Sequence, residues 1–235
     1  MARRETLLRP LVIREATRLF FENGYTQTTA SAVCARIGIS KGNLTFHFPT
    51  KEHMLDILVR MMCDFQWKKM TEATREGTSF LLAYCLELTA MAAICEKSSS
   101  MRDFYLSAYT HPMSLDTIRQ NDTEKLKTVF GAYCRGWTEA RFAETEAIVS
   151  GIEYATLMTT PRSADLPTRI ERALGAILGL FGVPPEEREA KIRRVLAMDY
   201  HAIGSEMLED FRKYTEGENE RAIEEKLALY RFSPS

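Results

Sequence analysis

The sequence predicts an all-α protein in which a small N-terminal unit of three helices precedes a larger helical domain. Glycine and proline are sparse, with 12 and 8 residues among 235, while the strong helix formers Leu, Ala, Met, Arg and Glu are plentiful. No stretch alternates apolar and polar residues as a half-buried strand does. Hydrophobic residues make up 45% of the chain, which is enough for a packed core and argues against disorder.

The first predicted helix covers about residues 6–22, where apolar side chains recur at helical spacing. Asn23-Gly24 ends it, because glycine tolerates the left-handed conformation that often follows a helix. The second helix begins after Thr28, with Thr28 or Thr29 as its N-cap, and ends at Gly38.

The third helix follows at once, from Lys41 to about Phe48, with Ser40 as its N-cap. Leu44 and Phe48 are four residues apart and are predicted to face inward. Two short helices joined by a glycine-containing turn form a helix-turn-helix. We therefore place a domain boundary between residues 49 and 50.

The larger domain, residues 50–235, is predicted to consist of helices throughout. A long helix covers about 51–73 and follows a cap at Thr50, and the next starts at 77–79. Ser100 to Asp103 has the form of a capping box, and Ser114 is predicted to cap the helix after Pro112. The remaining predicted helices cover about 139–159, 167–182, one helix from 184 to 217, and 220–230.

Charge and cysteine usage narrow the class of protein. Residues 1–60 hold nine Lys/Arg and five Asp/Glu, a net charge of +4, whereas the whole chain carries −1. A basic head on an acidic body suits contact with phosphates at one end only. The five cysteines are scattered and never form a CxxC pair. This pattern predicts a cytoplasmic protein without disulfides, a zinc site or a membrane span.

A set of residues at fixed spacing in about residues 10–55 resembles the signature of the TetR/AcrR family of bacterial regulators. The residues that carry the resemblance are Gly24-Tyr25, Thr28-Thr29, Val33, Ala35, Gly38-Ile39-Ser40-Lys41-Gly42, Leu44, His47-Phe48-Pro49 and Lys51-Glu52. The resemblance implies a homodimer that binds a palindromic operator in double-stranded DNA. It also implies a repressor that a small molecule releases.

The expected DNA contacts lie on the second and third helices. Lys41 can reach a guanine edge or a phosphate, Gly42 permits close approach of the backbone, and Asn43 can pair with adenine. Thr45 stands where the family usually has tyrosine, and a contact with a thymine methyl is possible there. The full expected set is Thr28, Thr29, Ser31, Lys41, Gly42, Asn43, Thr45, His47 and Lys51.

Two further sites are expected in the larger domain. Aromatic side chains and methionines with a few hydroxyls suit an apolar ligand pocket, and the candidates are Met62, Phe65, Trp67, Tyr84, Phe104, Tyr105, Tyr109, Phe130, Tyr133 and Trp137. Apolar stripes on two later helices suit a dimer interface, and the candidates are Ile148, Gly151, Ile152, Ala155, Ile170, Leu174, Ile177, Leu178 and Phe181.

Two other functions compete with a ligand-released repressor. The first is a DNA-binding module that a protein partner controls instead of a small molecule. The second is an enzyme, but the chain has no HExxH, GxSxG, Walker or GxGxxG motif. We therefore predict neither catalytic residues nor a cofactor.

Overall fold

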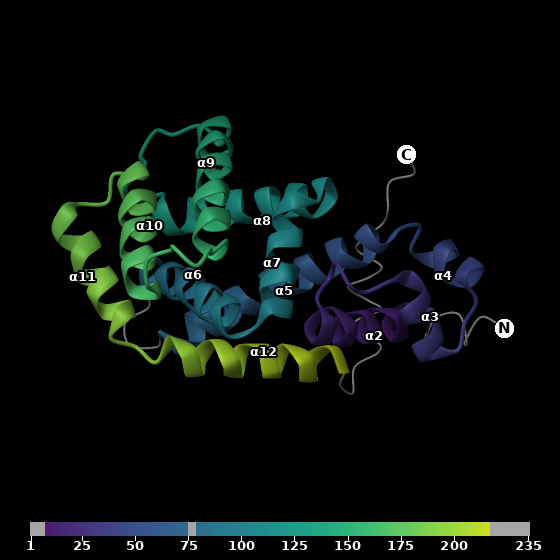
Figure 1. Ribbon diagram of the computed structural model, residues 1–235. Coiled ribbons are helices and arrows are strands. Elements are labelled where there is room, and N and C mark those ends of the chain that lie inside the picture. The colour runs from purple at the N-terminus through teal and green to yellow at the C-terminus, as the bar shows by residue number, and fades with distance from the viewer. Residues whose placement is uncertain (1–7, 75–78, 217–235) are drawn as a thin grey trace.

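The computed structural model describes residues 8–74 and 79–216, and within them it contains helices and no strands. A head at one end of the molecule is joined to a larger helical body (Figure 1). The prediction of an all-α protein is confirmed. The head consists of α2 (Leu8–Asn23), α3 (Ala30–Ile37) and α4 (Lys41–His47). The body consists of α5 (Lys51–Ala73), α6 (Phe80–Lys97), α7 (Ser99–Thr110), α8 (Pro112–Phe130), α9 (Glu139–Leu157), α10 (Leu166–Leu180), α11 (Pro185–Leu196) and α12 (Tyr200–Glu216).

The helix ends in the head follow from the sequence as predicted. Thr29 caps α3 by accepting a hydrogen bond from the Ala32 N–H, and Ser40 caps α4 in the same way through Asn43. Gly38 has φ of 71°, in the left-handed region, and its N–H donates to the Cys34 carbonyl. The turn between α3 and α4 therefore consists of the C-cap Gly38, Ile39 and the N-cap Ser40.

Buried side chains hold the three helices of the head together. Leu44 and Phe48 are each 1% exposed, as their spacing predicted. They belong to the same buried cluster as Phe20 of α2 and Val33 of α3. α4 packs against α3, and α3 packs against α2. The opposite side of α4 is left in solvent.

The head is docked against the body at several points besides the chain connection at α5. α2 packs against α7 and α12 as well as α5. Asp103 of α7 accepts hydrogen bonds from the Thr26 N–H (2.7 Å) and the Thr26 hydroxyl (2.6 Å). Gly24 is required beneath this contact, because its φ is 85° and an added Cβ would lie 2.6 Å from the Asp103 carboxylate. The Ser100 hydroxyl donates to the Phe21 carbonyl, 2.6 Å away.

Three predicted helix boundaries in the body are wrong. Ser98, and not Ser100, is the N-cap of α7, so Asp103 is free to bond the head instead of closing a capping box. α8 starts two residues before Ser114, because Pro112 sits at its first position, where no N–H is needed. The Ser114 hydroxyl donates back to the Ala108 carbonyl instead.

The third correction concerns the single helix predicted from 184 to 217. The chain breaks it between Leu196 and Tyr200, and α11 and α12 are separate helices. Both pack against α6, and α12 also packs against α2 and α5 (Figure 1). The helix predicted over 220–230 lies outside the described residues.

Candidate DNA-binding surface and internal cavity

The exposed side of α3 and α4 carries most of the residues expected to contact DNA. Thr29, Ser31, Lys41, Gly42, Asn43 and Thr45 are exposed, and His47 is half-buried. A Cβ added to Gly42 would meet only the Ser40 hydroxyl, at 3.9 Å. The protein's own packing therefore does not demand glycine at position 42, which leaves approach to another molecule as a reason for it.

Thr28 does not belong to this surface, which corrects one member of the expected set. It is 2% exposed. Its hydroxyl lies 2.7 Å from the Gly24 carbonyl and 3.1 Å from the Leu19 carbonyl, and donates there. Thr28 therefore ties the start of α3 to the end of α2 and has no hydroxyl to offer a phosphate.

Lys51 is half-buried at the start of α5 and has partners within the head. Its ammonium donates to the carbonyls of Tyr25 (2.8 Å) and Thr28 (2.9 Å) and lies 4.0 Å from the centre of the Tyr25 ring. Burial lowers the pKa of Lys51. Two of its three N–H groups are thus used, and one remains for a ligand.

Phe46 is a surface residue that the sequence reasoning missed. It is 82% exposed on α4, and its ring packs edge-on against His47 at 5.0 Å. Single exposed apolar side chains are common on protein surfaces, but Phe46 lies beside Thr45 and His47 on the side of α4 expected to contact DNA. The signal was present in the sequence, since inward-facing Leu44 and Phe48 place the residue midway between them outward.

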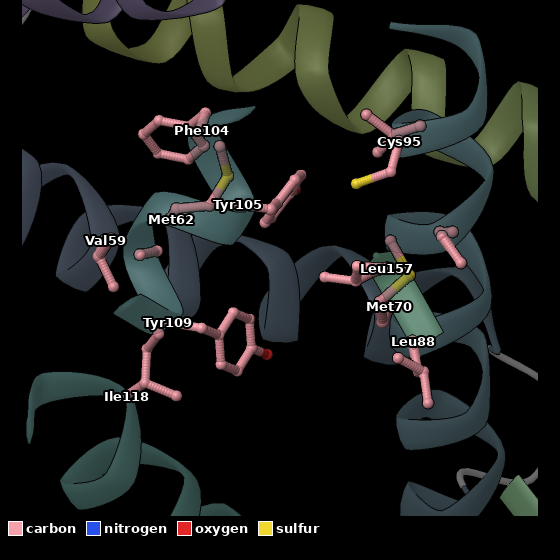
Figure 2. Packing of buried hydrophobic residues seen from close by; sticks show 14 of the residues in the cluster. Val59, Met62, Met70, Leu88, Cys95, Phe104, Tyr105, Tyr109, Ile118 and Leu157 are labelled. Carbon is pink, nitrogen blue, oxygen red and sulfur yellow. The ribbon is translucent and has the colours of Figure 1, made fainter. Parts of the chain in front are cut away.

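The body contains an internal cavity of about 40 Å³ between α5, α6, α7, α8 and α9. Of the ten residues expected to line a pocket, Met62, Tyr84, Phe104, Tyr105 and Tyr109 do so. Figure 2 shows Tyr105 and Tyr109 projecting from one side of the core toward the side that carries Leu88 and Cys95. The other lining residues are Val59, Cys63, Gln66, Glu87, Leu88, Met91, Ala108, Ile118, Asp122, Lys125 and Glu153.

The other five expected pocket residues lie elsewhere. Phe130 stacks on Phe181 at 4.0 Å, and Trp137 lies 5.7 Å from the same Phe181 ring. This aromatic cluster lies behind the cavity wall, where the Phe130 ring is 5.5 Å from that of Tyr84. Phe65 packs against Phe211 of α12. The remaining two are Tyr133, which donates to Glu187, and Trp67, which packs against Phe80. Helical periodicity identified them as apolar but not which interior space they face.

The cavity wall carries ionisable groups that the sequence reasoning also missed. The Tyr84 and Tyr109 hydroxyls donate to the two oxygens of Glu153, at 2.9 and 3.0 Å. The Lys125 ammonium lies 3.0 Å from Glu87 and 2.9 Å from Asp122. These groups come from α6, α7, α8 and α9, so no local sequence pattern brings them together.

Burial perturbs these groups strongly. It raises the pKa of Glu153 to about 8, with Asp122 adding to the effect and Lys125 opposing it. Burial alone would lower the pKa of Lys125, but the carboxylates of Asp122 and Glu87 raise it well above its usual value. Lys125 is therefore a permanent cation, while Glu153 holds a proton for much of the time at neutral pH.

The expected dimer residues divide between the surface and the core. On α9, Ile148 is 55% exposed, Gly151 and Ala155 are exposed, and Ile152 is half-buried. All five residues named on or after α10 are buried, namely Ile170, Leu174, Ile177, Leu178 and Phe181. The apolar stripe of α10 therefore packs inside the protomer, and its outer side carries Ala176, Gly179 and Leu180.

These features define a class of protein. An exposed polar face on the second of two short helices joined by a tight turn is the arrangement that places a helix in the major groove of DNA. Residues 12–57 match the model of the family described as bacterial regulatory proteins, tetR family. The head of this chain is therefore similar to the helix-turn-helix domain of TetR-family regulators. In the described residues, no group of His, Cys, Asp and Glu could hold a metal ion, and no helix is long and apolar enough to cross a membrane.

Curated relatives match only part of the chain. The chain is 40% identical over 65 residues to the HTH-type transcriptional regulator QacR of Staphylococcus aureus, which is 26% of this chain and 35% of that protein. It is 30% identical over 81 residues to the uncharacterized HTH-type transcriptional regulator YuxN of Bacillus subtilis, covering 34% and 28% of the two chains. The matches thus span about a third of each relative's length.

Solved structures resemble more of the chain, but at low similarity. A gamma-butyrolactone receptor (ArpA like protein) is 20% identical, covers 88% of this chain and 99% of its own, and gives a TM-score of 0.42. CprB from Streptomyces coelicolor, in complex with its operator sequence, is 21% identical with the same coverage and TM-score. Likeness at this level carries no argument about the ligand or the operator.

Proposed function

We propose that the protein is a cytoplasmic, homodimeric transcriptional regulator that binds a palindromic operator and is released from it by a small molecule. Residues 1–49 are the DNA-binding domain and residues 50–235 the regulatory domain. The observation that carries the proposal is the exposed face of α3 and α4, where Lys41, Asn43 and Phe46 stand clear of the protein's own core. The proposal includes no catalytic step.

Each exposed residue has a role that suits its chemistry. Asn43 pairs with a base edge, and Lys41 bonds guanine or a phosphate. Phe46 and the methyl group of Thr45 supply apolar contact with thymine methyl groups or sugars. Thr29 and Ser31, at the start of α3, bind a phosphate together with the free N–H groups there. His47 and the remaining N–H of Lys51 flank this surface as backbone contacts.

Dimerisation through α9 and α10 is supported by the apolar surface there. Ile148, Met158 and Leu180 are three of the large apolar side chains that stand exposed in the described residues. They lie on or just after α9 and at the end of α10. A Cβ added to Gly151 would have no neighbour within 4 Å, so the protomer itself leaves this face open. Two heads are needed because one half-site gives little specificity.

The route from cavity to head runs through α7. Phe104, Tyr105 and Tyr109 line the cavity, and Asp103 and Ser100 of the same helix bond the head. The cavity of about 40 Å³ is far below the roughly 300 Å³ or more of an ordinary ligand site. A ligand must therefore widen it, and a displaced α7 carries the head with it. Ligand and operator then oppose each other through this coupling.

The small cavity also favours the second candidate, a regulator controlled by a protein partner. In that case, the cavity stays closed, and a partner protein bound to the surface controls DNA binding. Selection of bound DNA from a random pool gives the operator, and a metabolite screen for release then separates the two candidates. A partner-controlled protein binds the operator but is released by none of the small molecules.

The contact surface is tested with the selected operator. Asn43→Ala should relax the preference at one position in each half-site, at a cost of about 1–3 kcal/mol. Arg194→Ala, an exposed cation on α11 remote from the head, is the control and should leave affinity and preference unchanged. If Asn43→Ala keeps the full preference, Asn43 does not read a base.

A further inference from the structure

We infer that the cavity binds a small organic cation, a protonated amine attached to an apolar group, with Glu153 as its counter-ion. The inference rests on the proposed function, because it names the chemical class of the effector that the regulatory domain takes. It starts from the charge of the cavity wall. Three carboxyl groups, those of Glu87, Asp122 and Glu153, face one ammonium, that of Lys125.

The single ammonium is already committed. Lys125 bridges Glu87 and Asp122 at 3.0 and 2.9 Å, and its pKa lies well above the usual range because of them. It forms no ion pair with Glu153. No arginine or histidine lines the cavity within the described residues. The wall therefore has an excess of negative charge that a bound cation would neutralise.

Glu153 is the carboxyl left without a cation. It is 7% exposed, and the hydrogen bonds it accepts come from two neutral donors, Tyr84 and Tyr109. A buried carboxylate without a counter-ion is strongly disfavoured, and burial accordingly raises the pKa of Glu153. A glutamine would link the same two tyrosines without that penalty. A purely structural role therefore does not explain the acid.

A second observation points to a missing polar partner in the same place. Tyr105 is 4% exposed and lines the cavity, yet its hydroxyl has no hydrogen-bond partner among the residues that the structure describes. Its oxygen can accept an N–H from a bound ammonium. Figure 2 shows its ring and that of Tyr109 on the same side of the core. The faces of Tyr84, Phe104, Tyr105 and Tyr109 suit a cation as well as an apolar group.

Other ligand classes fit less well. An anion would enter a wall with excess negative charge and find no free cation. A neutral apolar molecule would leave Glu153 and the Tyr105 hydroxyl as they are and gain nothing from either. The unbranched side chains of Met62 and Met91 can shift as the cavity widens around the apolar part of the ligand.

Three isosteric probes separate these classes: benzylammonium, benzyl alcohol and benzoate. Dissociation constants for the full chain are measured by calorimetry at neutral pH. Benzylammonium should bind about tenfold or more tightly than benzyl alcohol, and benzoate should bind least. Equal affinity for the cation and the alcohol overturns the inference, as does the absence of binding by benzylammonium.

Substitution of Glu153 supplies the second arm. Glu153→Gln should weaken benzylammonium by about tenfold or more and leave benzyl alcohol unchanged. Glu146→Gln is the matched control, because Glu146 is a buried carboxyl of the same helix that does not line the cavity, and it should change neither affinity. If Glu153→Gln binds the cation as wild type does, Glu153 is not the counter-ion. If Glu153→Gln does not fold, the comparison of the three probes on the wild-type protein still tests whether the cavity prefers a cation.

Operator release distinguishes this inference from the proposed function. If benzylammonium binds through Glu153 but never weakens operator binding, the cation site stands and the ligand-released switch fails. If the operator is bound and released by some other compound while no cation binds, the switch stands and the cation site fails.

Discussion

The contact between Asp103 and Thr26 offers a direct test of how the head is held on the body. Asp103→Ala removes the acceptor of two hydrogen bonds, one from the Thr26 N–H and one from its hydroxyl. Hydrogen bonds to a charged group contribute about 1.5–3 kcal/mol each. This pair lies near solvent, so we discount it to about 2 kcal/mol for both bonds together.

Hydrogen exchange at the Thr26 amide measures this quantity directly. A loss of about 2 kcal/mol raises its exchange rate roughly 30-fold. Asp103→Asn keeps one acceptor oxygen and should give a smaller increase. Asp116→Ala is the matched control, since that exposed aspartate bonds only Gln120 of its own helix. If the Thr26 amide in Asp103→Ala exchanges at the wild-type rate, the Asp103 contact does not stabilise the head on α7, and the proposed route from the cavity loses that contact.

Four further outcomes are expected. Phe46→Ala should weaken operator binding by about 1–2 kcal/mol and leave its salt dependence unchanged, because an apolar contact releases no counterion; a changed slope would contradict this. Lys51→Ala should lower the slope of log K against log salt by about 0.9 in mobility-shift titrations if its remaining N–H bonds a phosphate, and an unchanged slope removes it from the contacts. Ile148→Asp should give a monomer in sedimentation, and a dimer as tight as wild type would place the interface elsewhere. The free energy of unfolding should fall between pH 7 and 8 in urea titrations, and Glu153→Gln should flatten this decline.

The sign of the last prediction follows from the raised pKa of Glu153. Its pKa is about 8 in the folded protein and near 4.5 in the unfolded chain. The folded state therefore binds a proton that the unfolded state has released, and stability falls as pH rises across this range. The stability that the folded protein gains from the protonated Glu153 is fully present below pH 4.5 and is lost by about pH 8. Glu146, whose pKa is raised to about 7 by burial, also loses its proton in this range, so Glu153→Gln should remove only part of the decline.

The head was predictable because its structure is set locally. The caps Thr29 and Ser40 and the glycine at 38 act within a few residues, and the sequence specified each of them. Thr28 was wrongly assigned to the DNA contacts. The sequence pattern of a threonine before a helix is the same whether its hydroxyl is exposed to solvent or donates to carbonyls of the preceding helix. Only the packing of α2 on α3 decides this.

The body was less predictable because its interior depends on contacts between distant helices. The periodicity of α10 identified Ile170 and Leu174 as one apolar face but not whether that face meets the protomer or a partner. The glycine at position 179 makes room for the Arg188 guanidinium of α11, which would lie 2.7 Å from an added Cβ, and the sequence of α10 does not predict this neighbour. The cluster around Glu153 joins residues from four helices, so no sequence pattern within a single helix predicts it.

The length of α5 determines how far the head would move when the cavity changes shape. Its 23 residues span about 35 Å at 1.5 Å per residue, and its first residue bonds the head while later turns line the cavity. A tilt of about 5° about its far end moves the head by roughly 3 Å. In a symmetric dimer, the two heads would separate or approach by roughly 6 Å, a sixth of the 34–36 Å between successive major grooves. In the proposed dimer, a rearrangement within the cavity the size of a single methyl group would therefore be enough to move both α4 helices out of register with successive major grooves.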